Sequence, residues 1–212
     1  MNRLLIILFA LLAASPFARQ YFKTTKNYKS HAVAATIRSN NKKSATLARL
    51  KPFATELKLY AATNGFNSDY CFLVDMKIES GSNRFFIYDF QSDRIIKSGL
   101  VAHGYGNSGY NDVSFSNVPG SNCTSKGKYK VGNSYNGKFG LAYKLYGLDK
   151  TNSNAFNRFV VLHAMDCVPP IEISPLPICR SQGCPTVAPS FLQILKKYID
   201  ATEKPVLLWV FK

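Results

Sequence analysis

The sequence predicts a mainly β domain, an antiparallel and sandwich-like arrangement of strands with one or two flanking helices. From Tyr70 onward, short segments rich in β-branched and aromatic residues are divided by turn sequences such as ESGSN and QSD. Only two stretches after the chain's beginning place apolar residues at helical spacing. Many strands with few helices are typical of a predominantly antiparallel β domain.

The chain begins with an expected export signal over residues 1–18. One arginine precedes an apolar run from Leu4 to Ala14, and small residues follow, which is the layout of a secretory signal peptide. The run is shorter than the roughly 20 apolar residues that a membrane-spanning helix needs, so we expect no stable transmembrane anchor after cleavage. An uncleaved amphipathic anchor is the alternative. Export to the periplasm or cell envelope would place the protein where disulfides persist.

A basic linker or disordered arm is expected over residues 19–44, because this stretch is polar and shows no periodicity. The folded domain is expected over residues 45–212, with a helical preface at 46–64. Apolar residues recur in that preface at helical spacing, and Gly65 supplies a left-handed stop. Since proline is tolerated only near the first turn of a helix, Pro52 indicates that the helix proper starts close to it.

Strand-like segments and one further helix fill the rest of the domain. The helix follows Pro189 and Ser190 and places Leu192, Leu195 and Ile199 on one face. Because 46% of all residues are apolar, a sizeable core is available. The strands are expected within residues 71–78, 83–90, 95–104, 127–133, 141–148, 158–165 and 205–212.

The formal net charge of +15 indicates which kinds of partner the protein could attract. An exported basic protein does not routinely meet nucleic acid, but it does meet anionic cell-envelope polymers, which long-range attraction would concentrate around it. The alternative is that the lysines only solvate the surface.

The motif Gly104-Tyr-Gly106-Asn-Ser-Gly109 matches a dinucleotide fingerprint, but a turn-forming sequence follows it in place of the required helix. We therefore read residues 104–122 as a long functional loop and expect no cofactor.

Five cysteines in an exported chain leave one thiol unpaired or paired between chains. Cys167 and Cys179 bracket a short proline-rich segment, so we expect a disulfide between them, and Cys71 and Cys123 could then pair. This leaves Cys184 free. The alternative is a structural zinc site, since the side chains of four residues have ligand chemistry, but their spacing lacks the tight pairs of such sites and we expect no metal. The four are His163, Cys167, Cys179 and Cys184.

A free Cys184 in the turn SQGCP is a candidate nucleophile. Catalysis needs a thiolate, which an adjacent imidazole can supply, and His163 in the strand RFVVLHAM is the best partner. A buried core histidine is the alternative reading. Asp166 would lie on the opposite strand face, so a backbone carbonyl is the expected orienting group for the imidazole. The amides around Gly183 and Cys184 could form an oxyanion hole.

At these residues the sequence resembles the L,D-transpeptidases, in particular the branch described as murein L,D-transpeptidase catalytic-domain-like. The resemblance covers about residues 46 to 212. Its core is the turn Ser181-x-Gly183-Cys184 preceded by a strand histidine. The other segments that carry it are Val101 to Gly104 (V-x-H-G), Phe115 to Asn122 (F-S-N-x-P-G-S-N), Ser125 to Tyr129 (S-x-G-x-Y), Leu145 to Asp149 (L-x-G-L-D) and Val160 to His163 (V-x-L-H).

The resemblance implies a cysteine acyltransferase that acts on peptidoglycan stem peptides without a cofactor. Cys184 would attack the carbonyl at the L-centre of an L,D bond, D-alanine would leave, and an amine would resolve the thioester, with His163 as base and then acid. Water in place of the amine would make the protein a carboxypeptidase. The alternative from another class is a non-catalytic protein that binds the envelope.

Better-known members of the family carry a histidine at the position of Gln182 and an arginine at that of Thr186. Thr186 cannot pair with a substrate carboxylate. We therefore expect substrate contacts from Gln182, Arg180, His103 and Gly104, with His103 lining the same cleft as Cys184 at the mouth of the long loop. Ser181 and Gly183 are expected to form the active-site turn and its oxyanion hole.

Overall fold

The protein is described here by a computed structural model that covers residues 16–106 and 112–212. Residues 1–15 of the expected signal peptide, and part of the loop that follows Gly106, lie outside the described residues. The chain divides into two compact units, Met1–Ala48 and Arg49–Lys212. The domain boundary expected at residue 45 falls close to this division, and the signal, arm and domain limits stay a proposal.

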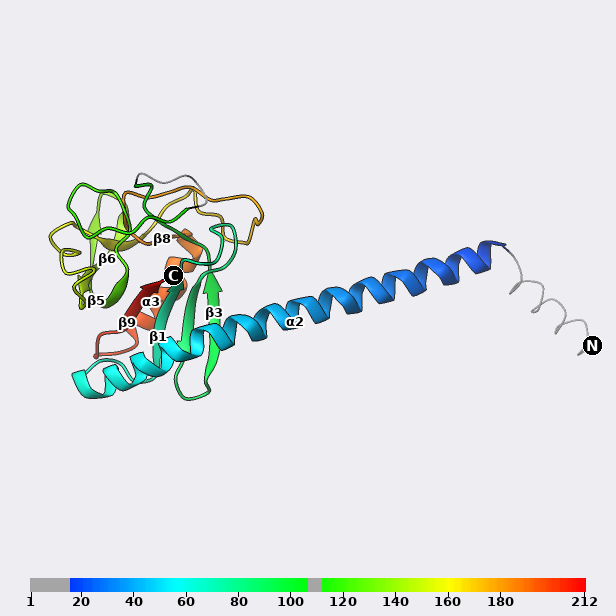
Figure 1. Cartoon of the computed structure of the whole chain (residues 1–212), viewed down its shortest axis with the longest axis horizontal. Coiled ribbons are helices and arrows are strands. Elements are labelled where there is room, and N and C mark those ends of the chain that lie inside the picture. Colours follow the sequence, from blue (N-terminus) through cyan, green and yellow to red (C-terminus); the bar gives the residue numbers. More distant parts are fainter. Residues whose placement is uncertain (1–15, 107–111) are drawn as a thin grey trace, which may run out of the picture. The chain divides into compact units, whose positions relative to one another are not determined.

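One helix, α2, runs from Pro16 to Asn64 (Figure 1). The helix begins before Pro52, so the start expected near that residue is wrong, and α2 also covers residues 19–44, where the sequence predicted an arm. No glycine or proline interrupts the chain between Pro16 and Pro52, so backbone hydrogen bonding can continue without an apolar stripe. Within the second unit, the helix buries Leu50, Ala54, Leu57 and Ala61 at helical spacing.

In the described residues, nine strands form one mixed sheet that is nearly closed into a barrel, with β3 and β4 at its two edges. Its order is β3-β2-β1-β9-β5-β6-β7-β8-β4. The strands, labelled in part in Figure 1, are β1 (Tyr70–Asp75), β2 (Phe85–Asp89), β3 (Arg94–Gly99), β4 (Val101–Ala102), β5 (Gly127–Gly137), β6 (Gly140–Gly147), β7 (Val161–Ala164), β8 (Thr186–Val187) and β9 (Leu207–Phe211).

The predicted mainly β fold class is confirmed. All strand pairings but two are antiparallel, and the exceptions are the parallel pairs β1–β9 and β7–β8. The second helix, α3 (Pro189–Asp200), lies where the sequence predicted it and buries Phe191, Leu192 and Leu195 against the core. The β7–β8 pair places His163 opposite Thr186, two residues after Cys184, so this register brings the expected site residues together.

Several segments differ from the strands expected from the sequence. The expected strand 95–104 is broken at Leu100 into β3 and β4, which lie at opposite edges of the sheet. Two further differences lie near Cys184. The segment 158–165 begins as a strand only at Val161, because Phe159 has a φ of 56° and ends a turn. The short strand β8 was not predicted, since two residues carry no detectable alternation. Both differences lie beside Cys184 and shape the site.

A disulfide joins Cys167 to Cys179, as expected, with an S–S distance of 2.16 Å. The pairing considered for Cys71 and Cys123 is not formed, and both thiols are free and buried. Cys71 lies on β1 with its side chain sealed in the domain, whereas Cys123 lies in a loop where its Sγ packs against Gly106. The disulfide also removes Cys167 and Cys179 from the zinc site considered as an alternative.

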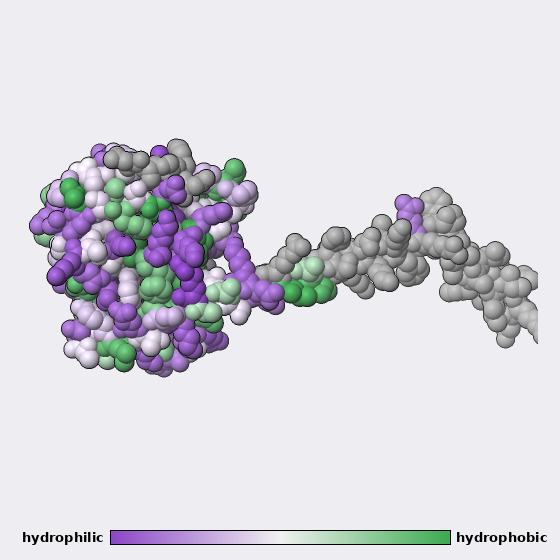
Figure 2. All heavy atoms as spheres, in the orientation of Figure 1, coloured by the Kyte–Doolittle hydropathy of each residue, from purple (hydrophilic) through white to green (hydrophobic). Residues whose placement is uncertain are grey.

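The visible face of the domain mixes hydrophilic and apolar residues, with hydrophilic side chains prominent across it (Figure 2). In the described part of the chain, no helix combines the length and the apolar character that crossing a membrane requires.

Candidate active site

Cys184 and His163 line one open pocket of about 860 Å³. Aromatic residues form part of its walls, among them Phe139, which stacks on the His163 ring with the centroids 4.5 Å apart. Phe139 lies in the two-residue turn that joins β5 to β6. No Asp or Glu is found among the described residues that line the pocket. Its cationic lining residues are Lys138, Arg158 and Arg180, and its amide residues are Asn122, Asn157 and Gln182.

The turn that carries Cys184 is built by Ser181 and Gly183. The Ser181 hydroxyl donates to the Cys184 carbonyl at 2.6 Å and accepts from the Gly183 amide at 3.1 Å. Gly183 has a φ of 117°, and a Cβ there would lie 2.8 Å from the Cys123 carbonyl oxygen, so only glycine fits. Because the Gly183 amide is engaged by Ser181, the Cys184 amide is the better oxyanion donor of the two that we expected.

A backbone carbonyl orients His163, as the sequence analysis expected. Nδ1 lies 3.0 Å from the carbonyl oxygen of Ala164. A carbonyl only accepts, so Nδ1 carries the proton in the neutral ring and Nε2 is left as an acceptor. This is the tautomer that a general base at Nε2 needs. Among the described residues, no hydrogen bond joins the imidazole to Cys184 Sγ in this state.

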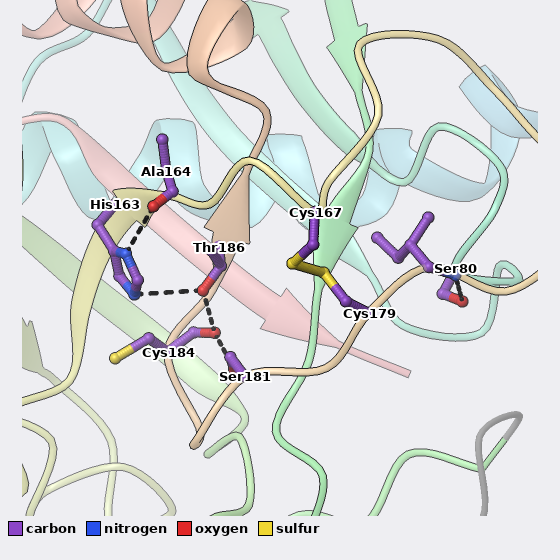
Figure 3. Close-up of a disulfide and its surroundings, with 9 residues drawn as sticks. Ser80, His163, Ala164, Cys167, Cys179, Ser181, Cys184 and Thr186 are labelled. Atoms are coloured by element: carbon purple, nitrogen blue, oxygen red, sulfur yellow. Dashed lines mark hydrogen bonds between the residues drawn. A yellow bond between two sulfur atoms is a disulfide. The ribbon is translucent and has the colours of Figure 1, made fainter. Parts of the chain in front are cut away.

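Thr186 connects His163 to the backbone of Cys184 (Figure 3). Its Oγ1 lies 3.3 Å from His163 Nε2 and 3.2 Å from the Cys184 carbonyl oxygen. The side chain is fully buried. The sequence analysis treated Thr186 only as the absence of an arginine, whereas the structure gives it a hydrogen-bonding position in the site.

Burial favours the neutral forms of both Cys184 and His163. Burial raises the pKa of the Cys184 thiol above its ordinary value of 9.0, and this is only partly opposed by the Val161 amide and by attraction to Arg158. Burial likewise lowers the pKa of His163 below 6.5, opposed by its bond to Ala164. The sequence had led us to expect a favoured thiolate, but desolvation outweighs the groups that favour charge.

Arg158 is the site residue that the sequence analysis missed. Its guanidinium donates to the carbonyl oxygens of Ser116 and Cys123 at 2.8 and 2.7 Å, and to the hydroxyls of Ser125 and Ser121 at 2.9 and 3.3 Å. It thereby ties residues 116–125 beneath the Cys184 turn while it lines the pocket. No local pattern signals this role, because all four acceptors lie more than thirty positions away in the chain.

Of the expected substrate-binding residues, Arg180 and Gln182 line the Cys184 pocket. Gly104 lies under the turn instead, since a Cβ there would meet Gly183 Cα at 2.8 Å and the Asn122 carbonyl at 2.2 Å. His103 does not line this pocket, and the expectation that it shares the Cys184 cleft is wrong. It is 1% exposed and lies against a separate pocket of about 270 Å³.

The orientation of His103 has a clear cause. Its Nδ1 accepts from Arg84 Nη2 at 2.9 Å, and Arg84 is itself buried, donating to the Val101 carbonyl. The His103 carbonyl meanwhile accepts from the Ser181 amide at 2.8 Å. His103 therefore supports the Cys184 turn through its backbone while its ring faces away from the pocket.

A family model described as the L,D-transpeptidase catalytic domain matches residues 41–210. The chain belongs to this family. The resemblance seen in the sequence motifs is thereby confirmed, and the family is one that modifies peptidoglycan. A search of curated proteins gave no match.

Solved structures of L,D-transpeptidase domains are among the similar folds. An L,D-transpeptidase from Xylanimonas cellulosilytica is 12% identical, covers 72% of this chain and 68% of its own, and has a TM-score of 0.41. The helical cell shape determining protein of Campylobacter jejuni is 14% identical over 68% of this chain and 47% of its own, with a TM-score of 0.44. An Enterococcus faecium L,D-transpeptidase is 15% identical over 68% and 50%, with a TM-score of 0.37.

This L,D-transpeptidase domain spans about half the length of several of the solved structures that it matches.

Proposed function

We propose that this protein is an exported L,D-transpeptidase in which Cys184 is the nucleophile and His163 the general base and acid. The observation that carries the proposal is that a free thiol at Cys184 and an imidazole at His163, with Nε2 left as an acceptor, line one pocket. The strand that carries His163 pairs with β8, the strand that directly follows the Cys184 turn. The substrate would be a peptidoglycan stem peptide, attacked at the carbonyl of its L-centre.

The neutral resting state implies that proton transfer accompanies attack. As Sγ approaches the carbonyl carbon, the thiol proton passes to His163 Nε2, and the carbonyl electrons move to its oxygen. The Cys184 amide is placed to donate to that oxygen. When the intermediate collapses, the C–N bond breaks, and the departing D-alanine takes the proton from Nε2. The product is a thioester at Cys184, with the site neutral again.

An amine from a second stem peptide would then attack the thioester, with Nε2 accepting its proton and returning it to the leaving sulfur. Water following the same path would give an L,D-carboxypeptidase, which is the second candidate. An open pocket admits either nucleophile. The aromatic and amide side chains on the pocket walls offer contacts for the second stem peptide, which favours transpeptidation over hydrolysis.

The charge of the site suits the proposed substrate. Stem peptides carry carboxylates, and the pocket presents Lys138, Arg158 and Arg180 with no acidic residue among its described lining. Arg158 supplies the positive charge that Thr186 cannot. The net charge of +15 would also hold the protein near anionic polymers of the cell envelope, where we place it in the periplasm or wall.

The test is mass spectrometry of purified wall peptides incubated with the protein. Cross-linked dimers with loss of D-alanine would support the transpeptidase, and shortened monomers alone would support the carboxypeptidase. Cys184→Ala should abolish either product. A non-catalytic envelope protein is the remaining reading, and it predicts no product and no difference between wild type and Cys184→Ala.

A further inference from the structure

Phe159 has a backbone conformation that its side chain does not favour. Its φ is 56°, in the left-handed region. The two other non-glycine residues with positive φ in the described chain are Asp93 and Asn122, types whose short polar side chains tolerate this region. A bulky residue there is unusual, and such outliers gather where function requires them.

The local hydrogen bonds explain how the conformation is imposed. The Val160 amide donates to the Ala155 carbonyl at 2.9 Å, and the Phe159 amide donates to the Phe156 carbonyl at 3.0 Å. These are the two bonds of a Schellman motif, which places Phe159 at the position where glycine is the usual residue. The motif needs a left-handed residue there, but nothing in it needs an aromatic ring.

The ring is not retained for packing either, since Phe159 is 84% exposed. Phe159 lines the Cys184 pocket. The carbonyl of Phe159 is 3.8 Å from Cys184 Sγ, so its backbone adjoins the nucleophile. A strained and exposed aromatic residue beside the reacting atom serves neither the stability of the backbone nor that of the core.

We propose that the Phe159 ring is a specificity-determining wall that contacts aliphatic carbon atoms of the residues flanking the attacked bond. This rests on the proposed function. A peptide extends by about 3.3–3.6 Å per residue, so only groups within a residue or two of the attacked carbonyl come near a ring whose backbone adjoins Sγ. Those groups are the methyl of the leaving D-residue and the side-chain methylenes of the L-residue, while sugar rings lie several residues further away.

Phe159→Gly tests the ring alone, because glycine is the usual residue at this position of a Schellman motif and keeps the backbone conformation. Glycine relieves the left-handed strain, so the thermal midpoint of Phe159→Gly should equal or exceed that of wild type. The matched control is Phe156→Leu, since Phe156 is an exposed aromatic residue of the same turn that stacks on Tyr146 and does not line the pocket. The rate at which iodoacetamide alkylates Cys184 should be unchanged in Phe156→Leu.

We expect Phe159→Gly to lower kcat/KM on a free tetrapeptide by about tenfold, mainly through KM, because losing contact with a methyl or methylene group changes selectivity by roughly 10- to 200-fold. Phe156→Leu should match wild type. A peptide ending in glycine, and one with alanine at the L-centre, distinguish the two sources. If the ring contacts the methyl of the D-residue, Phe159→Gly and wild type should have equal kcat/KM on the peptide ending in glycine. If it contacts the methylenes of the L-residue, they should have equal kcat/KM on the peptide with alanine at the L-centre.

Binding of the tetrapeptide to Cys184→Ala, with and without Phe159→Gly, is measured by saturation-transfer NMR and does not depend on turnover. A weaker signal in the double variant supports the wall even if the proposed chemistry fails. Equal binding and equal kcat/KM would overturn it. A deficit seen only with a disaccharide-linked peptide would overturn it in favour of a sugar contact, and a lowered thermal midpoint would show that the ring is structural.

Discussion

The Thr186 hydroxyl lies 3.3 Å from His163 Nε2 and 3.2 Å from the Cys184 carbonyl oxygen. A hydroxyl has one proton, so with a neutral imidazole it can donate to only one of these acceptors. Once Nε2 is protonated, the ring donates to Thr186 Oγ1, and the hydroxyl is free to donate to the carbonyl. Both bonds are therefore made only when His163 is charged, and Thr186 favours the imidazolium.

This relationship predicts that Thr186→Val weakens the coupling between thiol and imidazole. Valine keeps the buried shape but has no oxygen, and a net hydrogen bond contributes about 0.5–1.5 kcal/mol. Alkylation of Cys184 by iodoacetamide at pH 7 should then slow by about two- to tenfold. Thr186→Ser, which keeps the hydroxyl, should react close to the wild-type rate. If Thr186→Val matches wild type across the pH range, the hydroxyl has no part in proton transfer.

That Cys184 and His163 line one pocket was predictable, because short sequence patterns surround both residues. The glycine before the cysteine indicated a tight turn, and the histidine within an apolar segment indicated a strand side chain close enough to serve as a base. Thr186 was misread because its role depends on the β7–β8 register, which two residues of strand cannot reveal. His103 was placed in the wrong pocket for a related reason, since its ring direction is set by Arg84, a partner nineteen residues earlier in the chain.

The limits of sequence reading are also clear in the helix and the last turn before β7. The helix α2 continues through residues without an apolar stripe, so periodicity could not find its start. The segment RFVVLHAM reads as a continuous strand, but the left-handed Phe159 delays that strand to Val161. In both cases backbone hydrogen bonding decides the structure, and side-chain pattern does not record it.

The disulfide between Cys167 and Cys179 should stabilise the domain mainly by restricting the unfolded chain. The two residues are separated by 12 positions, and the loop-entropy estimate for a loop of that length is about 3 kcal/mol. The double variant Cys167→Ser/Cys179→Ser should lose about that much free energy of unfolding in urea titrations. Cys71→Ala removes a thiol that forms no disulfide and leaves no unpaired hydroxyl in the core, so it is the control for the loss of a cysteine. Equal midpoints for the double variant and wild type would show that the bridge does not constrain the unfolded chain.

His103 predicts a loss of stability in mild acid. Burial, together with the charges of Arg84, Arg180 and Lys212, lowers its pKa from 6.5 to about 4. Between pH 6.5 and about pH 4 the unfolded chain binds a proton at His103 that the native ring does not. The contribution of neutral His103 to the free energy of unfolding is therefore full above this window and is lost as the pH falls through it.

Urea unfolding at pH 7.5 and pH 5 tests this, with His103→Gln as the comparison, because an amide can still accept from Arg84 but does not titrate. Wild type should lose more free energy of unfolding than the variant between the two pH values. The other histidines titrate in both proteins and cancel in the difference. An identical loss in the two proteins would mean that His103 takes up its proton without unfolding.

The structure predicts two separable effects of Arg158: its charge lowers the pKa of Cys184, and its hydrogen bonds hold residues 116–125 in place. Its attraction lowers the pKa of Cys184 against the larger effect of burial, so in Arg158→Met that pKa should rise further and alkylation at pH 7 should slow several-fold. The rates should converge at a pH well above the thiol pKa. Hydrogen bonds to a charged group contribute about 1.5–3 kcal/mol each, so the methionine variant should also lose about 2 kcal/mol or more of stability as residues 116–125 come loose.

Arg158→Lys distinguishes the two effects, because lysine keeps the charge but cannot reproduce the fork that reaches both carbonyls and both hydroxyls. It should lose stability much as Arg158→Met does, yet retain most of the alkylation rate at pH 7. If both variants alkylate equally slowly, Arg158 acts only by holding the loop beneath the Cys184 turn. If both alkylate at the wild-type rate, the cation is too well screened by its four acceptors to influence the thiol, and another group must offset the burial of Cys184.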